Sequence, residues 1–267
     1  MKENGSAKCR VETLKESCSA GEGYYARVFY RLPEAVDYVE IRAKREPLRL
    51  THYAQLTAAE GYVFAPFTLS EQNPFWLIPA DEKIRHKVEA PVTQSPKAER
   101  CEGDTEIKSY ARAFAQCKEM LSDGHLEKIV LSRTATLRMC TPLTAAHRHA
   151  LFLESCHRYP HSFVSLVELP APYGAWLMAT PEVLVETETN GFHTMALAGT
   201  SPVSDESKLL LENWSPKNRR EQACVADYIR KHLTALSTEV RESAVYVRRA
   251  ASLLHLCTDF HLTSSGE

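Results

Sequence analysis

The sequence predicts a sheet-rich protein of the α/β or α+β class. Short runs of aromatic and β-branched residues recur along the chain, separated by Pro, Gly and charged clusters, and such runs are typical of strands. Between them lie longer stretches whose apolar residues have the three- and four-residue spacing of helices. Strand runs mixed with long helices indicate one of these two classes.

The first part of the chain is predicted to be rich in strands. Residues 1–22 are polar and are expected to form a flexible N-terminal segment. Over 23–91, we expect strands at YYARVFYRL, DYVEIRA, GYVFAPF and PFWLIPA. A polar connector begins at residue 92, and TEIKSYARAFAQCKEMLSDG then predicts a helix that Asp104 caps and Gly124 ends.

The remaining part alternates between strands and helices. EKIVLSRTATLR predicts a long strand, and TPLTAAHRHALFLESCHRY predicts a helix. Four strands follow, at SFVSLVEL, GAWLMAT, EVLVETE and FHTMALA, with a turn at Thr189-Asn190-Gly191. A second long helix is expected from about Pro216 with Ser215 as its N-cap, and AVYVRRAASLLHL then resumes strand character.

Composition and charge argue against a nucleic-acid or membrane partner. The 267 residues are 44% hydrophobic and 25% charged, and 34 acidic against 32 basic residues give a net charge of −2. The chain has no stripe of Lys and Arg interleaved with aromatic residues, which is the usual footprint of nucleic-acid binding. No apolar run approaches the length that crosses a membrane.

The cysteines favour a reducing compartment. None of the eight forms a C-x-x-C pair, and the polar N-terminus has no apolar core of the kind that a signal peptide needs. We therefore expect reduced thiols in a cytoplasmic protein. The alternative is a zinc site seeded by Cys156 and His157, but adjacent residues rarely ligate together in structural zinc sites.

Three charged residues are candidates for chemistry. Glu221 lies four residues before Val225, so helical spacing places it on the core-facing side, where a carboxylate needs a cation, a metal ion or strong donors. A salt bridge to Arg219, Arg220 or a neighbour is the simpler explanation. Lys128 and Glu182 open predicted strands, where charges are usually solvated. A lysine acts as a base only if its surroundings lower its pKa, and a glutamate acts as an acid only if they raise it.

Two further segments are candidates for a ligand-binding site. His255 lies in the apolar stretch SLLHLC, where a histidine is more often a hydrogen-bonded core residue than a catalyst. The strand FHTMALA is expected to end in a turn at Gly199 and Thr200, where a glycine lets backbone amides approach a ligand and the threonine adds a donor. The chain has neither a Walker loop nor a dinucleotide fingerprint, so those cofactors are not indicated.

In order and approximate spacing, five motifs resemble those of the chorismate-utilising enzymes: KIVLSR, TPEVLV, MALAGT, SPKNRREQACVADYI and LLHLCTDF. This family includes isochorismate, salicylate, anthranilate and aminodeoxychorismate synthases. The resemblance covers residues from about 105 to the end, with a looser match over 24–80. It implies large mixed, mostly antiparallel sheets flanked by helices, with a partial chorismate-binding catalytic region over 92–267.

The resemblance also implies roles for the candidate residues. Lys128 matches the general base that activates water, and Glu182 matches the general acid. Glu221 matches the first residue of a Glu-His pair that ligates magnesium, so Mg²⁺ is the expected cofactor. Four positions would line the chorismate site, with the histidine beside the substrate ring: Ala198, Gly199, Thr200 and His255.

The combination of Lys128 and Ala198 resembles the members that use water. Anthranilate synthases usually lack the lysine, and aminodeoxychorismate synthases typically carry PIKG where this chain has ALAG. We therefore expect an isochorismate synthase of menaquinone or siderophore biosynthesis, which adds water at C2 of chorismate and expels the C4 hydroxyl. No amidotransferase subunit is expected. Salicylate synthase, or another chorismate-utilising enzyme, is the alternative.

Three departures from the family pattern weaken the expected metal site. Asn218 stands where the family commonly has aspartate, and Gln222 stands where it has the histidine after Glu221. The sequence also ends at Glu267, before the HPTPAVGG stretch, the further metal-binding glutamates, and the Arg and Tyr that hold the substrate carboxylates. The expectation is a fold incomplete at the C-terminus that binds Mg²⁺ and chorismate weakly or not at all. A non-catalytic remnant or partner-binding module is the competing hypothesis.

Overall fold

The computed structural model describes most of the chain after the predicted N-terminal segment 1–22, which lies outside the described residues. The chain divides into two compact units. The first unit draws on Met1–Tyr30, Asp37–Lys87 and Ser165–Leu177, and the second on Arg31–Val36, Val88–Val164 and Met178–Glu267. The described ranges are 23–56, 60–71, 73–90, 98–100, 104–124, 126–236, 239–250 and 252–263.

A five-stranded sheet in the order β10-β9-β1-β2-β6 forms most of the first unit. The predicted runs YYARVFYRL and DYVEIRA form β1 and β2, which pair antiparallel with Ala26 opposite Ala43. Ala26 and Val28 are fully buried, because alternate side chains of a strand share one face of the sheet. The five strands are β1 (Ala26–Arg31), β2 (Asp37–Ala43), β6 (Glu82–Lys87), β9 (Phe163–Glu168) and β10 (Ala175–Thr180).

A smaller antiparallel sheet completes the first unit, in the order β3-β5-β4. The predicted runs GYVFAPF and PFWLIPA supply two of its strands, and the third is a short strand that the pattern did not reveal. Their apolar residues Leu50, Phe75 and Leu77 form a buried cluster. The elements are β3 (Leu48–Leu50), the 3₁₀ turn η1 (Tyr53–Gln55), β4 (Gly61–Phe64) and β5 (Phe75–Pro79).

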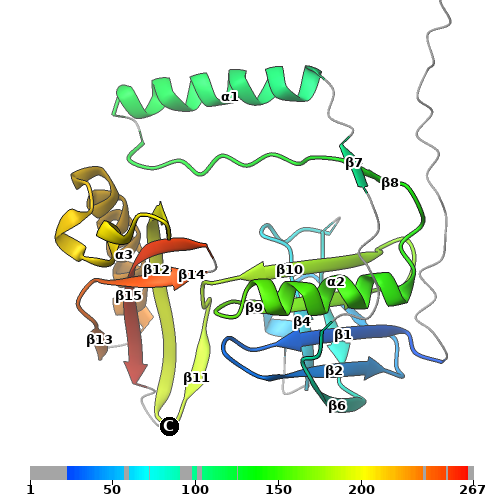
Figure 1. Cartoon of the computed structure of the whole chain (residues 1–267). Helices are drawn as coiled ribbons and strands as arrows, with labels where there is room; N and C mark the ends of the chain where they lie inside the picture. Colours follow the sequence, from blue (N-terminus) through cyan, green and yellow to red (C-terminus); the bar gives the residue numbers. More distant parts are fainter. Residues whose placement is uncertain are drawn as a thin grey trace, which may run out of the picture. The chain divides into compact units, whose positions relative to one another are not determined.

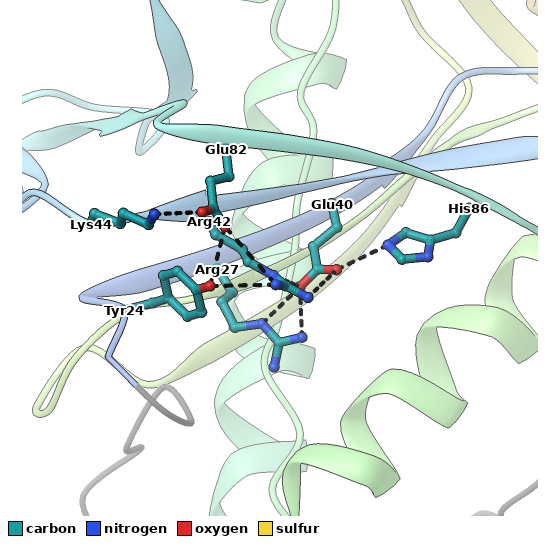
Figure 2. A network of polar contacts seen from close by, with 7 residues as sticks. All are labelled: Tyr24, Arg27, Glu40, Arg42, Lys44, Glu82 and His86. Atoms are coloured by element: carbon teal, nitrogen blue, oxygen red, sulfur yellow. Dashed lines mark hydrogen bonds and ion pairs between the residues drawn. The ribbon is translucent and has the colours of Figure 1, made fainter.

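One face of β1, β2 and β6 carries a polar network around Glu40 (Figure 2). Strand alternation and register place Arg27, Arg42 and His86 on the same face as this carboxylate. Arg27 and Arg42 each donate two hydrogen bonds to it, of 2.7 to 3.1 Å, and His86 Nε2 lies 3.0 Å from Oε2. Burial alone would raise the pKa of Glu40, but the bonds from Arg42 and Arg27 outweigh burial and lower this pKa to about 2.

Two long antiparallel strands form the centre of the sheet in the second unit. They are β12 (Gly191–Pro202) and β15 (Leu253–Thr263), which pair from Gly191 opposite Thr263 to Pro202 opposite Leu253. The prediction that the strand FHTMALA ends at Gly199 was therefore wrong, because β12 continues to Pro202. Shorter strands border this pair in the order β11-β12-β15-β13, with β14 also on β15: β11 (Glu186–Glu188), β13 (Val240–Glu242) and β14 (Tyr246–Ala250).

The helix α3 (Pro216–Leu236) lies against β12 and β15, as Figure 1 shows. The predicted cap is confirmed, because the backbone N–H of Asn218 donates to Ser215 Oγ at 3.2 Å. The residue that faces the sheet is Gln222, which is 1% exposed and donates to the Ala196 carbonyl. The prediction of a core-facing Glu221 was thus wrong by one residue, since the buried stripe runs from Gln222 through Ala226.

Two other helices belong to the second unit. The helix α1 (Asp104–Ser122) ends near Gly124, whose φ of 71° suits the residue after a helix. The helix α2 (Ala145–Arg158) has Thr144 as its N-cap, whose side chain accepts a hydrogen bond from the His147 backbone. No helix in the described part of the chain is long and apolar enough to cross a membrane. Short elements accompany them: β7 (Ala98–Arg100), β8 (Leu137–Met139), η2 (Glu206–Leu209) and η3 (Leu211–Asn213).

The long strand predicted from EKIVLSRTATLR is largely wrong. Only its end lies in a strand, β8, and residues 126–136 form a connection without helix or strand between α1 and β8 (Figure 1). A strand needs a neighbour for its backbone N–H and C=O groups. Among the described residues, no strand pairs with 126–136, and Val130 is 83% exposed.

Candidate functional site

Lys128 and Glu221 form an ion pair in the second unit. Lys128 Nζ lies 3.2 Å from Glu221 Oε1, and the two side chains are 26% and 35% exposed. Lys128 comes from the connection after α1, whereas Glu221 comes from the second turn of α3. The fold thus brings together two of the predicted site residues that lie far apart in the sequence.

Glu182 lies near the same lysine. The backbone N–H of Leu197, on β12, donates to its carboxyl group, and the charge of Lys128 also acts on it. Although Glu182 as a residue is exposed, the protein around its carboxyl group desolvates it, and this burial raises the pKa more than the other two effects lower it. A raised pKa is the direction that a general acid needs.

Gly199 forms a β-bulge within β12. Ala198 lies opposite Leu256 and Thr200 lies opposite His255, so the glycine is an extra residue between two paired ones. Its φ of 71° is the left-handed conformation that favours glycine, and an added Cβ would lie 3.2 Å from the carbonyl oxygen of Asn218. The bulge therefore brings β12 close to the first turn of α3.

The bulge also fixes His255. The Nδ1 atom of this histidine lies 3.1 Å from the Gly199 carbonyl oxygen and 3.3 Å from Thr200 Oγ1. A carbonyl only accepts hydrogen bonds, so we assign the proton to Nδ1, which leaves Nε2 as an acceptor. Burial lowers the pKa of His255, and the bond to Gly199 opposes this effect only in part. The neighbouring Ala198 is 5% exposed, so its methyl group lies within the protein.

A cavity of about 300 Å³ lies beside the ion pair. Lys128 and Glu221 line it, whereas Glu182 and the four predicted substrate-binding residues do not. The prediction missed two basic lining residues, although one lies four residues before Glu221 and the other three residues after that one, spacings that make side chains neighbours on a helix. The remaining lining residues are Leu121, Glu127, Ile129, Lys217, Arg220 and Cys224.

Glu221, the predicted magnesium ligand, belongs to no cluster of potential ligands among the described residues. Within the described ranges, no group of three or more His, Cys, Asp or Glu residues lies close enough together to hold a metal ion. The Glu221 carboxylate is paired with Lys128, and Gln222 is turned into the sheet, where its amide also donates to Thr258. The same finding leaves the zinc alternative at Cys156 and His157 without support among these residues.

Comparison with known proteins identifies the family. The family described as chorismate binding enzyme matches residues 70–265. Two solved structures have the same fold: one described as a 2,3-dihydroxybenzoate-specific isochorismate synthase, DhbC, from Bacillus anthracis, and MenF, the menaquinone-specific isochorismate synthase from Escherichia coli. No curated protein matched the chain in sequence.

Both structural matches cover most of the chain at low sequence identity. DhbC is 18% identical with a TM-score of 0.71, and the match covers 91% of this chain and 69% of DhbC. MenF is 15% identical with a TM-score of 0.69, and the match covers 91% of this chain and 66% of MenF. The chain thus spans about two thirds of the length of each. The predicted fold class is confirmed, and the chain belongs to the family of chorismate-binding enzymes.

Proposed function

We propose that the chain acts as an isochorismate synthase, which converts chorismate into isochorismate by adding water at C2 and expelling the C4 hydroxyl. The observation that carries this proposal is the position of the Lys128 ammonium, which lies 3.2 Å from Glu221 and close enough to Glu182 to act on its carboxyl group. Family membership and the fold shared with two isochorismate synthases support it.

The reaction needs a base and an acid, because water is a poor nucleophile and hydroxide is a poor leaving group. In this proposal, the free amine of Lys128 takes a proton from the water that attacks C2. Glu182 gives a proton to the C4 hydroxyl, which leaves as water while the double bonds of the ring shift. The raised pKa of Glu182 favours the protonated form that this step uses.

The ion pair with Glu221 bears on the role of Lys128. An amine takes up a proton only when it is not already an ammonium, whereas Lys128 is the cation of the 3.2 Å ion pair with Glu221. The base role therefore requires this pair to open before water is activated. Magnesium is the cofactor that the family resemblance implies, and dependence on it is a prediction that a chelator tests.

The test is to incubate the purified chain with chorismate and Mg²⁺ and to separate the products by chromatography. Isochorismate is the expected product, and Lys128→Ala and Glu182→Gln should each lower its rate at least about 100-fold, which is typical for loss of acid–base catalysis. Lys231→Ala is the control, because this lysine lies on α3 outside the cavity.

Each other outcome identifies an alternative. Full activity of Lys128→Ala would show that the base is another group. Salicylate as the final product would show the added lyase step of a salicylate synthase. A folded chain that makes no product, and gives no heat when chorismate and Mg²⁺ are added in a calorimeter, would indicate a non-catalytic module.

A further inference from the structure

Two basic side chains at the cavity have no partner among the residues that the structure describes. They are Lys217 and Arg220, both exposed and both in the first turns of α3. Other arginines of this helix are engaged. Arg219 donates to backbone carbonyls that precede the helix, and Arg230 pairs with Glu242. Of the three arginines of α3, the one without a partner among the described residues therefore lies at the cavity.

Helical spacing places these donors on one wall. Residues 217, 220, 221 and 224 follow each other at intervals of three, one and three, so their side chains lie on the same side of α3. The facing wall comes from Leu121 at the end of α1 and from residues 127–129. This row of four side chains differs from the row of α3 that packs on the sheet, which contains Gln222 and Ala226.

The charges of this cavity favour an anion. Lys128 and Glu221 neutralise each other, and Glu127, whose carboxylate lies 3.8 Å from Cys224 Sγ, is the other acidic lining residue. Lys217 and Arg220 leave the lining with a net positive charge. Lys217 is also the second residue of a 21-residue helix, so the positive end of the helix dipole adds to the attraction.

We propose that Lys217 and Arg220 bind a carboxylate of the substrate in this cavity. This inference rests on the proposed function, because chorismate is a dianion with two carboxylates. The guanidinium of Arg220 can donate two parallel hydrogen bonds to a carboxylate, and Lys217 supplies a second positive charge. The carboxylate of Glu127 lies at Cys224 and repels an anion there, so the substrate carboxylate is directed away from Cys224 and toward Lys217 and Arg220.

The experiment is to titrate chorismate into the full chain by calorimetry and to compare Lys217→Gln, Arg220→Gln and the double variant with the unaltered chain. Each single change should weaken binding about tenfold, the size expected for one charge-assisted contact, and the double change more. Lys231→Gln, a charge removed from the same helix away from the cavity, should leave the Kd unchanged. Thermal melts should coincide, because exposed side chains without partners contribute little to stability.

The outcomes separate this inference from the function on which it rests. Binding by the chain that is equally tight in all variants would overturn the carboxylate site and leave the isochorismate synthase proposal standing. Binding that weakens as expected, with no turnover, would support the site and count against the enzyme. No binding by the unaltered chain at millimolar chorismate would overturn both.

Discussion

Two glutamates, one in each unit, have pKa shifts of opposite sign. The carboxylate of Glu40, in the first unit, accepts four hydrogen bonds from Arg27 and Arg42, faces His86, and has a side chain that is 3% exposed (Figure 2). Glu182, in the second unit, receives one backbone hydrogen bond from Leu197. Donors lower the pKa of the first carboxyl, whereas desolvation raises that of the second. The contrast separates a carboxylate that is held ionised by several donors from one whose surroundings favour the protonated form.

The elements that carry these residues explain the difference. The partners of Glu40 come from β1, β2 and β6, whose antiparallel register fixes them on one face of a sheet. Lys128 comes from a connection without regular structure, and Glu182 precedes the short edge strand β11. A saturated network within a sheet rigidifies the fold, whereas sparsely bonded groups on connections can rearrange around a ligand.

The largest expected effect comes from Glu40→Gln. Removal of the negative charge leaves Arg27, whose side chain is 22% exposed, without its counter-ion, and leaves Arg42, 28% exposed, with only the Glu82 carboxylate at 4.0 Å. Breaking such a pair by removing one partner costs about 3 kcal/mol in the free energy of unfolding, measured by urea denaturation. The control is Glu60→Gln, because the Glu60 side chain is 79% exposed and solvent screens its pairing with Lys83, so the loss of stability should be much smaller. Equal losses for both variants would contradict the contrast.

Acid should act on the two glutamates in opposite directions. The pKa of Glu40 lies at about 2 in the folded chain against 4.5 for an ordinary glutamate. Its contribution to stability is therefore complete above pH 4.5 and is lost as the pH falls toward 2, by at most about 3 kcal/mol. For Glu182, whose pKa is raised, ionisation above pH 4.5 opposes folding instead.

Urea denaturation between pH 2.5 and 6 measures this dependence. The unaltered chain should lose stability toward low pH more steeply than Glu40→Gln, which lacks the titrating group. Glu182→Gln should retain the steep acid loss, because it leaves the Glu40 network intact. If the chain and Glu40→Gln have the same slope, the network does not lower the pKa of Glu40.

Gly199→Ala tests the backbone on which the second unit depends. A left-handed φ costs a residue with a Cβ about 1–3 kcal/mol, and here the Cβ would also press on the Asn218 carbonyl at 3.2 Å. Gly174→Ala is the matched control, because Gly174 has a φ of 70° and nothing within 4 Å of an added Cβ. The difference between the two losses of stability isolates the contact with α3. Equal losses of stability in the two variants would show that the contact with the Asn218 carbonyl does not contribute to the cost.

Local patterns in the sequence predicted an element correctly where the spacing of its own residues determines which side chains are buried or capped. The alternation in β1 and β2 and the cap at Ser215 were predicted correctly. The segment after α1 has a strand-like composition but no partner among the described residues, and an isolated glycine such as Gly199 is read equally well as a turn or as a bulge. In each case the deciding contact is made by a distant part of the chain.

The candidate site shows the same limit. The family resemblance selected Lys128, Glu182 and Glu221, and the roles it implies for them stay predictions. The ion pair between Lys128 and Glu221 depends on the approach of the connection after α1 to α3, which no local pattern reveals. By contrast, Lys217 lies four residues before Glu221 and three before Arg220, spacings that make side chains neighbours on a helix, so these two basic residues could have been predicted from the sequence.

The smallest expected effect concerns His193, whose imidazole lies between two carboxylates. In the Glu40 network the cations are arginines instead. The ring nitrogens of His193 lie 2.8 Å from Glu186 and 2.9 Å from Asp259, and the ring stacks on His261 at 4.9 Å. Burial would lower the pKa of His193, but hydrogen bonds to Asp259 and Glu186 outweigh burial and raise it. The stabilisation is therefore present below pH 6.5 and is lost as the pH rises through the folded-state pKa.

The size of this effect should stay below about 1 kcal/mol, because the Glu186 side chain is 57% exposed and solvent screens the pair. Thermal melts between pH 5.5 and 8.5 measure it, and His193→Gln should remove the dependence while retaining a polar side chain. The Glu40 network contains two arginines that stay charged throughout this range, so Glu40→Gln should leave the alkaline slope unchanged. An alkaline slope that persists in His193→Gln would show that His193 is not the group that titrates.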